Sequence, residues 1–335
     1  MVGEILGREV RVTIDDVARA AGVSRQTVSR AMNGKGEISA ATRRRVLATI
    51  EELDYRPSVF ARGMRTQRGG TLGLILSDIA NPFFPAVARG VFDAAAARGS
   101  SVVVHNTDAH AGRESAAARD VLERGADGVI GFFEALADED LTEVHRRLPL
   151  VVADRRAPEP GVASVSSDFA TGTRLAVEHL HARGHRRLGM LDGAVGVDHV
   201  RRHAFTDAAA PGSPVVTGPP TLTGGAAAAD QLLAEHPAVT ALFAFNDLMA
   251  VGAVRALRER GRRVPEDCAV VGYDDLTLAA DLDPPLTTVH TDKYELGRTL
   301  VEVLDDVVRA RRDGSAPGVA PHRLLPATLV VRRSG

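Results

Sequence analysis

From residue 71 onward, strand-like and helix-like stretches alternate, and this alternation limits the possible folds most strongly. Short apolar runs occur at 71–76, 101–105, 128–133 and 149–153, with Ala-rich helical stretches at 84–98 and 113–124. The pattern restarts after Val165, with strands expected at 187–191, 239–245 and 268–273 and helices at 168–183, 224–235 and 247–260. Such alternation predicts parallel sheets covered by helices on both faces. We therefore expect an α/β core of two successive doubly wound lobes.

The segment before the core has a different, purely helical pattern. Thr13 followed by Asp16 is typical of a helix N-cap. Gly22 can supply the positive φ of a tight turn, and Ser24 can cap a second helix over 25–32. A third helix is expected from about residue 40 to residue 53. Two short helices around a glycine turn, supported by a third, are the helix-turn-helix arrangement, so the headpiece is expected to be all-α.

Charge is distributed unevenly between these two parts. The chain as a whole carries a net charge of −2. Residues 11–68, however, hold twelve basic and six acidic side chains, whereas the rest of the chain is net acidic. A basic module on an acidic body is expected when only one end of a protein meets nucleic acid phosphates.

The second helix offers side chains suited to reading base edges. Arg25, Gln26 and Arg30 fall on its predicted outer face. Arg can donate two hydrogen bonds to guanine, and Gln can pair in the same way with adenine. The side chains expected at phosphates are those of Thr13, Ser24, Thr27, Ser29, Asn33 and Lys35. The alternative is a basic, solvated helix on an ordinary three-helix domain.

Several long runs resemble the lactose-repressor/purine-repressor (LacI/GalR) family of transcriptional regulators. They are VTIDDVARAAGVSRQTVSRAMNG, ISAATRRRVLATIEELDYRPSVFARGMRT, NPFF at 81–84, RLAVEHLHARGHRRLGML at 174–191 and FNDLMAVGAVRAL at 245–257. The resemblance covers nearly the whole chain from Arg11. It implies a repressor of pseudo-palindromic operator DNA with a periplasmic-binding-protein-like core, and it supports Arg25, Gln26 and Arg30 as the base-reading residues.

The resemblance also implies a division into parts. These are a headpiece at 11–55, a hinge helix and linker at 56–70, and a core at 71–335. The first lobe would comprise 71–166 and 292–322, and the second 167–291 and 323–335, with a helix at about 292–311 returning to the first lobe and a last strand at 323–332 crossing to the second.

The segment after Arg56-Pro57 is implied to fold on the minor groove of DNA. The residues expected to contact the groove are Ser58, Ala61, Arg62 and Met64. Met64 stands where family members usually have Leu, and its apolar, flexible side chain can still act as a wedge between base pairs. Gly63 replaces a small polar residue and weakens the helix. The alternative is a linker that never orders.

Polar side chains follow the predicted strands of the core, where open α/β sheets bind ligands. The residues expected to bind a small-molecule effector are Asp78, Asn81, Phe83, Phe84, Asp154, Arg201, Asn246 and Asp274. Carboxylates and amides suit vicinal hydroxyls, and a Phe ring suits the apolar face of a pyranose, so a sugar is the expected effector. For Arg201 and Asp274 the family pattern favours ligand contact, whereas Asp108 and Asp247 are at least equally suited to cap helices.

Other effectors and other protein classes remain alternatives. The effector could be a purine or nucleoside corepressor, and a carbohydrate-binding protein without a DNA function would share the two lobes. We find no catalytic motif, and therefore expect no enzyme and no cofactor. His179, His181 and His185 lack neighbouring Cys or carboxylate ligands, so no metal is expected.

Location and assembly can also be predicted. The single Cys268, the absence of a secretory signal and the absence of an apolar run of about 20 residues favour the cytoplasm, with the protein at the nucleoid and no membrane contact. The chain lacks a Leu-heptad tail after its last strand, so we expect a homodimer, which suits a palindromic operator. The segment 206–225, with Pro214, Pro219 and Pro220, looks shorter than in the family and could alter the wall of the cleft.

Overall fold

The computed structural model describes residues 12–33, 38–55, 70–193, 200–314 and 321–335. The chain divides into two compact units, residues 1–69 and 70–335. The first unit corresponds to the basic, helical segment and the second to the α/β segment.

The N-terminal unit contains three helices, α1 (Ile14–Ala21), α2 (Arg25–Asn33) and α3 (Ala40–Glu52). The Thr13 side chain caps α1 and the Asp16 carboxylate accepts from the Thr13 backbone, which completes a capping box. Gly22 ends α1 with φ 62°, a conformation that costs glycine little. The three helices bury one small core, which includes Val17, Val28 and Val46. The helix-turn-helix arrangement predicted from the sequence is confirmed.

The first lobe of the core is built on a six-stranded, all-parallel sheet. The strand order is β11-β5-β4-β3-β1-β2. Its strands are β1 (Thr71–Leu76), β2 (Ser101–Asn106), β3 (Gly128–Gly131), β4 (Leu150–Ala153), β5 (Ala163–Ser167) and β11 (His322–Leu325). Its helices are α5 (Phe83–Ala97), α6 (Ala111–Glu123), α7 (Asp138–Arg147) and α13 (Lys293–Arg312). Apolar clusters lie on both faces of the sheet, which is why the strands are almost continuously hydrophobic.

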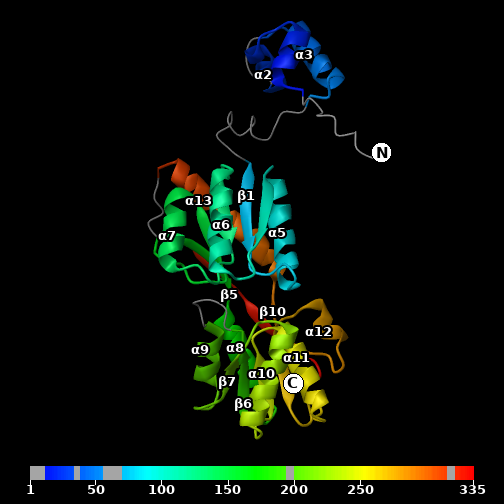
Figure 1. Ribbon diagram of the computed structural model, residues 1–335, viewed down its shortest axis with the longest axis vertical. Helices are drawn as coiled ribbons and strands as arrows, with labels where there is room; N and C mark the ends of the chain where they lie inside the picture. The colour runs from blue at the N-terminus through cyan, green and yellow to red at the C-terminus, as the bar shows by residue number, and fades with distance from the viewer. Residues whose placement is uncertain (1–11, 34–37, 56–69, 194–199, 315–320) are drawn as a thin grey trace, which may run out of the picture. The chain divides into compact units, whose positions relative to one another are not determined.

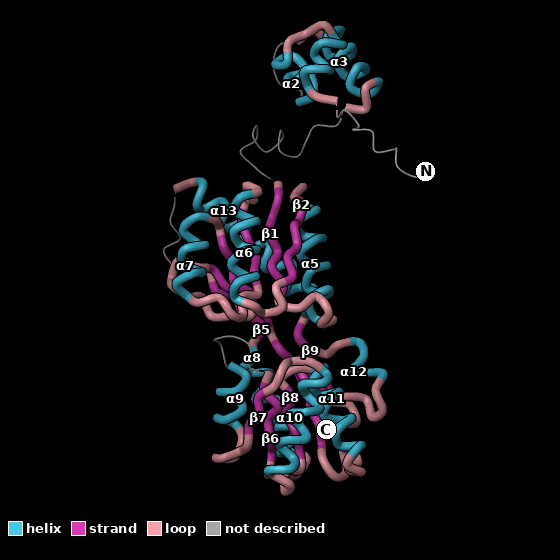
Figure 2. Tube along the Cα trace, viewed as in Figure 1, coloured by secondary structure: helices cyan, strands magenta, loops and turns pink. Residues whose placement is uncertain are grey.

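The second lobe repeats this plan with one antiparallel edge strand. The strand order is β12-β10-β9-β8-β6-β7, and β12 runs antiparallel to β10. Its strands are β6 (Leu188–Asp192), β7 (Val215–Thr217), β8 (Ala241–Ala244), β9 (Ala269–Asp274), β10 (Thr287–Thr291) and β12 (Ala327–Val330). Its helices are α8 (Phe169–Ala182), α9 (Val200–Ala208), α10 (Leu222–Glu235), α11 (Asp247–Glu259) and α12 (Thr277–Asp281). Figure 2 shows that loops of both lobes gather where the lobes face each other.

The chain passes between the lobes three times, at 167–169, 291–293 and Pro326. The last crossing corrects the sequence-based division. The prediction of a single strand over 323–332 in the second lobe is wrong. Residues 322–325 pair with β5 of the first sheet, and only 327–330 pair with β10. Pro326 lacks a backbone N–H and lies at the break between the two strands.

Helices α5 and α13 cross at an unusually close distance on one face of the first sheet. A Cβ atom placed on Gly90 would lie 2.1 Å from the Tyr294 carbonyl oxygen, and one on Gly297 would lie 2.1 Å from the Val87 carbonyl oxygen. Only glycine at both positions allows the two backbones to approach this closely. The crossing holds α13, which enters from the second lobe, firmly against the first.

Candidate functional site

A cavity of about 530 Å³ lies between the two lobes, beyond the carboxyl ends of their strands. All eight residues that the sequence singled out for an effector line it. The lining is Ser77, Asp78, Asn81, Phe83, Phe84, Asp108, Ala109, Phe132, Phe133, Glu134, Ala153, Asp154, Arg155, Phe169, Val200, Arg201, Pro219, Pro220, Thr221, Phe245, Asn246 and Asp274. Residues up to Arg155 come from the first lobe and the others from the second, so a ligand here would touch both.

Arg201, at the start of α9, lies among aromatic rings on the side of the second lobe. Its guanidinium carbon is 3.6 Å from the ring centroid of Phe245 and 4.3 Å from that of Phe169. One guanidinium N–H donates to the Phe245 carbonyl oxygen at 3.1 Å. The rings fix the plane of the guanidinium and leave its remaining N–H groups for other acceptors.

Three carboxylates of the pocket interact electrostatically with Arg201. Burial raises the pKa of Asp154 to about 6, and it raises the pKa of Asp274 well above the usual value; Arg201 lowers both in part. Burial also raises the pKa of Glu134, with a hydrogen bond from Ser77 opposing the shift. Asp154 directly follows β4 and Asp274 is the last residue of β9, and their φ values of 50° and 106° are ones that L residues seldom adopt. Strained backbone of this kind is typical of binding sites.

The two predicted amide residues already have structural partners. The Asn246 side chain caps α11 by accepting from the Met249 N–H at 2.9 Å, and its amide nitrogen donates to the Pro220 carbonyl oxygen. Asn81 accepts from the Phe83 N–H at 3.0 Å. Both therefore shape the wall of the cavity, and their amide groups retain only part of their hydrogen-bonding capacity for a ligand.

Phe83 and Phe84 form an apolar wall with Phe132. The three rings meet edge to face, with centroids 5.2–6.2 Å apart, and Phe83 and Phe84 are almost fully buried. A sugar would therefore meet the edges of this cluster rather than a freely exposed ring.

Other lining residues were missed in the sequence for identifiable reasons. The strand predicted over 128–133 ends at Gly131, so Phe132, Phe133 and Glu134 lie beyond its carboxyl end. Phe169 follows β5, a strand that was not predicted, and Phe245 was placed inside a strand that ends at Ala244. The same rule about strand ends would have found all of them had the strand boundaries been right. The segment suspected of altering the cleft does contribute to its wall, through residues 219–221.

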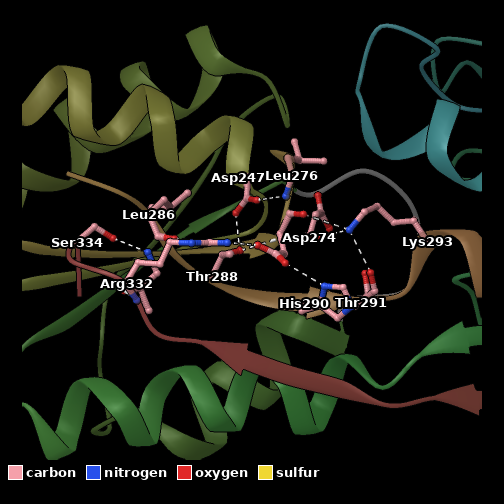
Figure 3. Close-up of polar contacts among 12 residues, drawn as sticks. Asp247, Asp274, Leu276, Leu286, Thr288, His290, Thr291, Lys293, Arg332 and Ser334 are labelled. Carbon is pink, nitrogen blue, oxygen red and sulfur yellow. Dashed lines mark hydrogen bonds and ion pairs between the residues drawn. The ribbon is translucent and has the colours of Figure 1, made fainter. Parts of the chain in front are cut away.

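A polar network connects the floor of the pocket to one of the interlobe crossings (Figure 3). The Lys293 ammonium, at the start of α13, donates to the carbonyl oxygens of Asp274, Asp275 and Thr291. The Asp275 carboxylate accepts from Arg332 at 2.7 Å and contacts His290 Nδ1 at 3.0 Å. The Asp274 backbone is thereby hydrogen-bonded to the segment that joins the lobes.

Asp247 belongs to the same network and not to a helix cap. Its carboxylate accepts from the Leu276 N–H at 2.7 Å and from the Thr288 hydroxyl at 2.6 Å. Burial raises its pKa to about 7, although both hydrogen bonds act in the opposite direction. Asp247 thus fixes the loop after β9 from behind, where it does not line the cavity.

The three predicted base-reading side chains share one exposed surface of α2. Arg25, Gln26 and Arg30 are exposed, whereas Val28 and Ala31 on the opposite side are buried. Arg25 lies 3.6 Å from the Asp15 carboxylate, and both side chains are more than half exposed. The structure therefore leaves all three side chains accessible to a partner.

The residues predicted to contact phosphates are only partly described. Thr13, Ser24 and Thr27 lie at the starts of α1 and α2, and the Ser24 hydroxyl accepts from the Thr27 N–H at 3.2 Å. Ser29 is half-buried within α2. The Asn33 side chain, Lys35 and the hinge residues Ser58, Ala61, Arg62 and Met64 lie outside the described residues.

The described residues include neither a cluster of metal ligands nor a membrane-spanning helix. Within them, no group of three or more His, Cys, Asp or Glu side chains could hold a metal ion. None of the described helices is both long and apolar enough to span a bilayer.

A helix-turn-helix unit with an exposed basic surface and a two-lobed core with an interlobe cavity define a ligand-responsive DNA-binding regulator. Residues 13–58 match the model of the "bacterial regulatory proteins, lacI family", and residues 177–335 match that of a "periplasmic binding protein-like domain". The transcriptional repressor PurR of Aliivibrio fischeri is 34% identical over 87% of this chain and 90% of its own.

Solved structures agree with this classification. The lac repressor dimer bound to operator and the anti-inducer ONPF superposes with a TM-score of 0.85, 32% identity, and coverage of 96% of this chain and 98% of that one. A complex of the regulator CelR with cellobiose gives a TM-score of 0.71, 32% identity, and coverage of 97% and 100%. The chain belongs to the lacI family, whose members are DNA-binding transcriptional regulators and not enzymes.

Proposed function

We propose that this protein is a homodimeric, cytoplasmic repressor whose affinity for a pseudo-palindromic operator is set by a sugar bound between its lobes. The observation that carries this proposal is the cavity, in which both lobes present polar groups around Arg201. Guanidinium and carboxylate groups can bind adjacent hydroxyls, since one supplies donors and the other acceptors. The CelR complex shows a relative with a bound sugar, cellobiose.

A sugar fits the aromatic side of the cavity better than a purine or nucleoside does. The guanidinium of Arg201 lies within 4.3 Å of the ring centroids of both Phe169 and Phe245. A flat base would have to displace Arg201 to stack on either ring, whereas a polyol can use the free edge of the guanidinium. A sugar is therefore the effector class that the geometry favours.

We assign operator contacts to the helical unit. Arg25, Gln26 and Arg30 would read base edges in the major groove, as exposed side chains of a recognition helix do. The groups assigned to phosphates are those of Thr13, Ser24, Thr27, Ser29, Asn33 and Lys35, and those assigned to the minor groove are Ser58, Ala61, Arg62 and Met64.

Ligand binding would change the angle between the lobes, since the cavity is lined from both. In a dimer, that angle sets the spacing of the two hinge segments and hence their ability to order on the operator. Coupling of about 1–3 kcal/mol, typical of allosteric proteins, would change operator affinity about 5–150-fold.

The experiment combines footprinting with ligand titration. Footprinting on DNA upstream of neighbouring genes identifies an operator, and gel shifts then measure its affinity across a panel of sugars and purines. We expect one sugar to shift the affinity in either direction. A shift with a purine alone would contradict the sugar class, and the absence of any footprint would contradict the proposal as a whole.

A further inference from the structure

Glu134 occupies a place in the cavity that the sequence did not suggest. It lies just beyond the carboxyl end of β3, and its carboxylate accepts a hydrogen bond of 2.5 Å from the Ser77 hydroxyl. Both residues line the interlobe cavity. Ser77 follows β1, so the pair joins the ends of two neighbouring strands.

A buried carboxylate holds the loop that carries Glu134. Glu114 of α6 is fully buried and accepts from three successive backbone N–H groups, those of Glu134 at 3.0 Å, Ala135 at 3.2 Å and Leu136 at 2.7 Å. A carboxylate with several backbone donors is strongly anchored, because each hydrogen bond is charge-assisted. The backbone at Glu134 is therefore fixed before any ligand arrives.

A buried guanidinium holds the same loop through its carbonyl groups. Arg155 is only 4% exposed and donates to the carbonyl oxygens of Phe133 at 2.9 Å and Leu136 at 2.8 Å. It also pairs with the Asp138 carboxylate at 2.6 Å. Glu114 and Arg155 hydrogen-bond to backbone groups of the loop and not to each other. Among the described residues, no hydrogen bond from the Arg155 guanidinium reaches the Glu134 carboxylate.

The cavity consequently has more acidic than basic side chains. Five acidic residues line it, Asp78, Asp108, Glu134, Asp154 and Asp274, against two arginines. Asp108 pairs with Arg113 outside the cavity lining and the Arg155 guanidinium is engaged by the loop, which leaves Arg201 as the cation that interacts with Glu134, Asp154 and Asp274. Asp274 is only 5% exposed, and within the described residues no hydrogen bond reaches its carboxylate. An unpartnered buried carboxylate at a cavity wall calls for a donor on the ligand.

We propose that Glu134 is a specificity-determining residue and that it selects effectors carrying a positively charged amino group, of the amino sugar class. The inference rests on the proposed function, since it names the kind of sugar that the same cavity takes. An ammonium group on the ring supplies three donors and one positive charge to a wall that has an excess of acceptors. A neutral sugar supplies the donors but no positive charge to favour the ionised form of carboxyl groups whose pKa is raised by burial.

The test compares matched sugars on the full-length protein by titration calorimetry. The pairs are D-glucosamine with D-glucose and D-galactosamine with D-galactose. For at least one pair, we expect the amino sugar to bind about tenfold more tightly or better, because a charge-assisted hydrogen bond is worth more than a neutral one. In the Glu134→Gln variant, which keeps the size and the Ser77 contact, the two members of that pair should bind about equally.

Glu123→Gln, at the exposed end of α6, is the matched control and should keep the preference. Equal binding of both members of each pair by the unmodified protein, or a preference that survives Glu134→Gln, would overturn this inference while leaving a sugar effector in place. Binding by none of the four sugars would overturn it too; if the gel-shift panel then responds to another, neutral sugar, the proposed function alone survives.

Discussion

Arg30 lies one helical turn along α2 from the Arg25–Gln26 pair, exposed and with the buried Val28 and Ala31 on the opposite side. If it reads a guanine, Arg30→Ala should lower the preference for operator over a scrambled duplex by about 1–3 kcal/mol. Fluorescence anisotropy with both duplexes measures this difference. Arg174→Ala, on the exposed surface of α8 in the core, serves as the control. Unchanged discrimination by the Arg30 variant would remove it from the base-reading set.

Asp154 provides a prediction about pH. Its pKa in the folded protein is about 6, against 3.8 for an unperturbed side chain, so the folded state holds a proton that the unfolded state releases between these values. Stability from this group therefore falls as pH rises through that window. Asp154→Asn can still accept from the Ser167 N–H. Relative to the unmodified protein, it should gain about 1–3 kcal/mol in free energy of unfolding between pH 4 and pH 6, and then stay constant.

Chemical unfolding at a series of pH values measures that gain. A difference between the two proteins that stays flat from pH 4 to pH 8 would show that the Asp154 carboxylate is ionised throughout. The comparison with the variant is essential, because carboxylates with lowered pKa values, such as Asp305 beside Arg309, affect stability in the opposite direction.

At the level of single residues, the sequence indicated the polar groups of the cavity but not their supports. Asp154 and Asp274 follow strong apolar strands, and that position alone was enough to select them. Glu114 lies 20 residues along the chain from Glu134, from whose N–H it accepts, and Arg155 lies 22 residues from Phe133, to whose carbonyl it donates. No local pattern marks a buried charge whose partners are backbone groups of a distant loop, so these residues could not be predicted.

The crossing of α5 and α13 provides a prediction at the level of elements. Gly297→Ala would place a Cβ atom 2.1 Å from the Val87 carbonyl oxygen. This oxygen belongs to the backbone of α5, which cannot move aside as a flexible side chain can. We expect a loss of about 1–3 kcal/mol in the free energy of unfolding, as in overpacked cores. Urea unfolding of the full chain measures it.

Gly112→Ala is the matched control. Gly112 lies in the exposed first turn of α6, where an added Cβ would meet only the exposed His110 ring, at 3.2 Å. Because that side chain can move where backbone cannot, and alanine favours helix, the loss of stability should be much smaller than for Gly297→Ala. Equal stability of the Gly297 variant and the unmodified protein would mean that the two helices can separate at no cost.

Long, apolar or Ala-rich elements were predictable, whereas short and polar ones were not. Strand β5 has the sequence ASVSS and is buried throughout, but its serines gave no apolar run. Tertiary contacts compensate for this, since Ser164 hydrogen-bonds His322 of β11. Strand β7 has only three residues, and β11 and β12 were merged because nothing but Pro326 separates two similar stretches.

At the scale of the whole molecule, the proposed regulation depends on communication between the cavity and the helical unit. The cavity is lined from both lobes, and the Lys293 network ties its floor to a crossing between them (Figure 3). Arg201 contacts the cavity from the second lobe and, among the described residues, makes no hydrogen bond to that network. Replacing Arg201 should therefore abolish the response to ligand without changing the operator affinity of the ligand-free protein.

The most direct measurement is operator affinity with and without the sugar that binds best, for the unmodified protein and for Arg201→Ala, at about 0.15 M salt. We predict tight, sequence-specific binding by both proteins without sugar, on the order of 10³-fold or more above bulk DNA. Sugar should change the affinity of the unmodified protein about 5–150-fold and that of the variant hardly at all. Binding that shows no preference for any sequence, in either ligand state, would contradict the account.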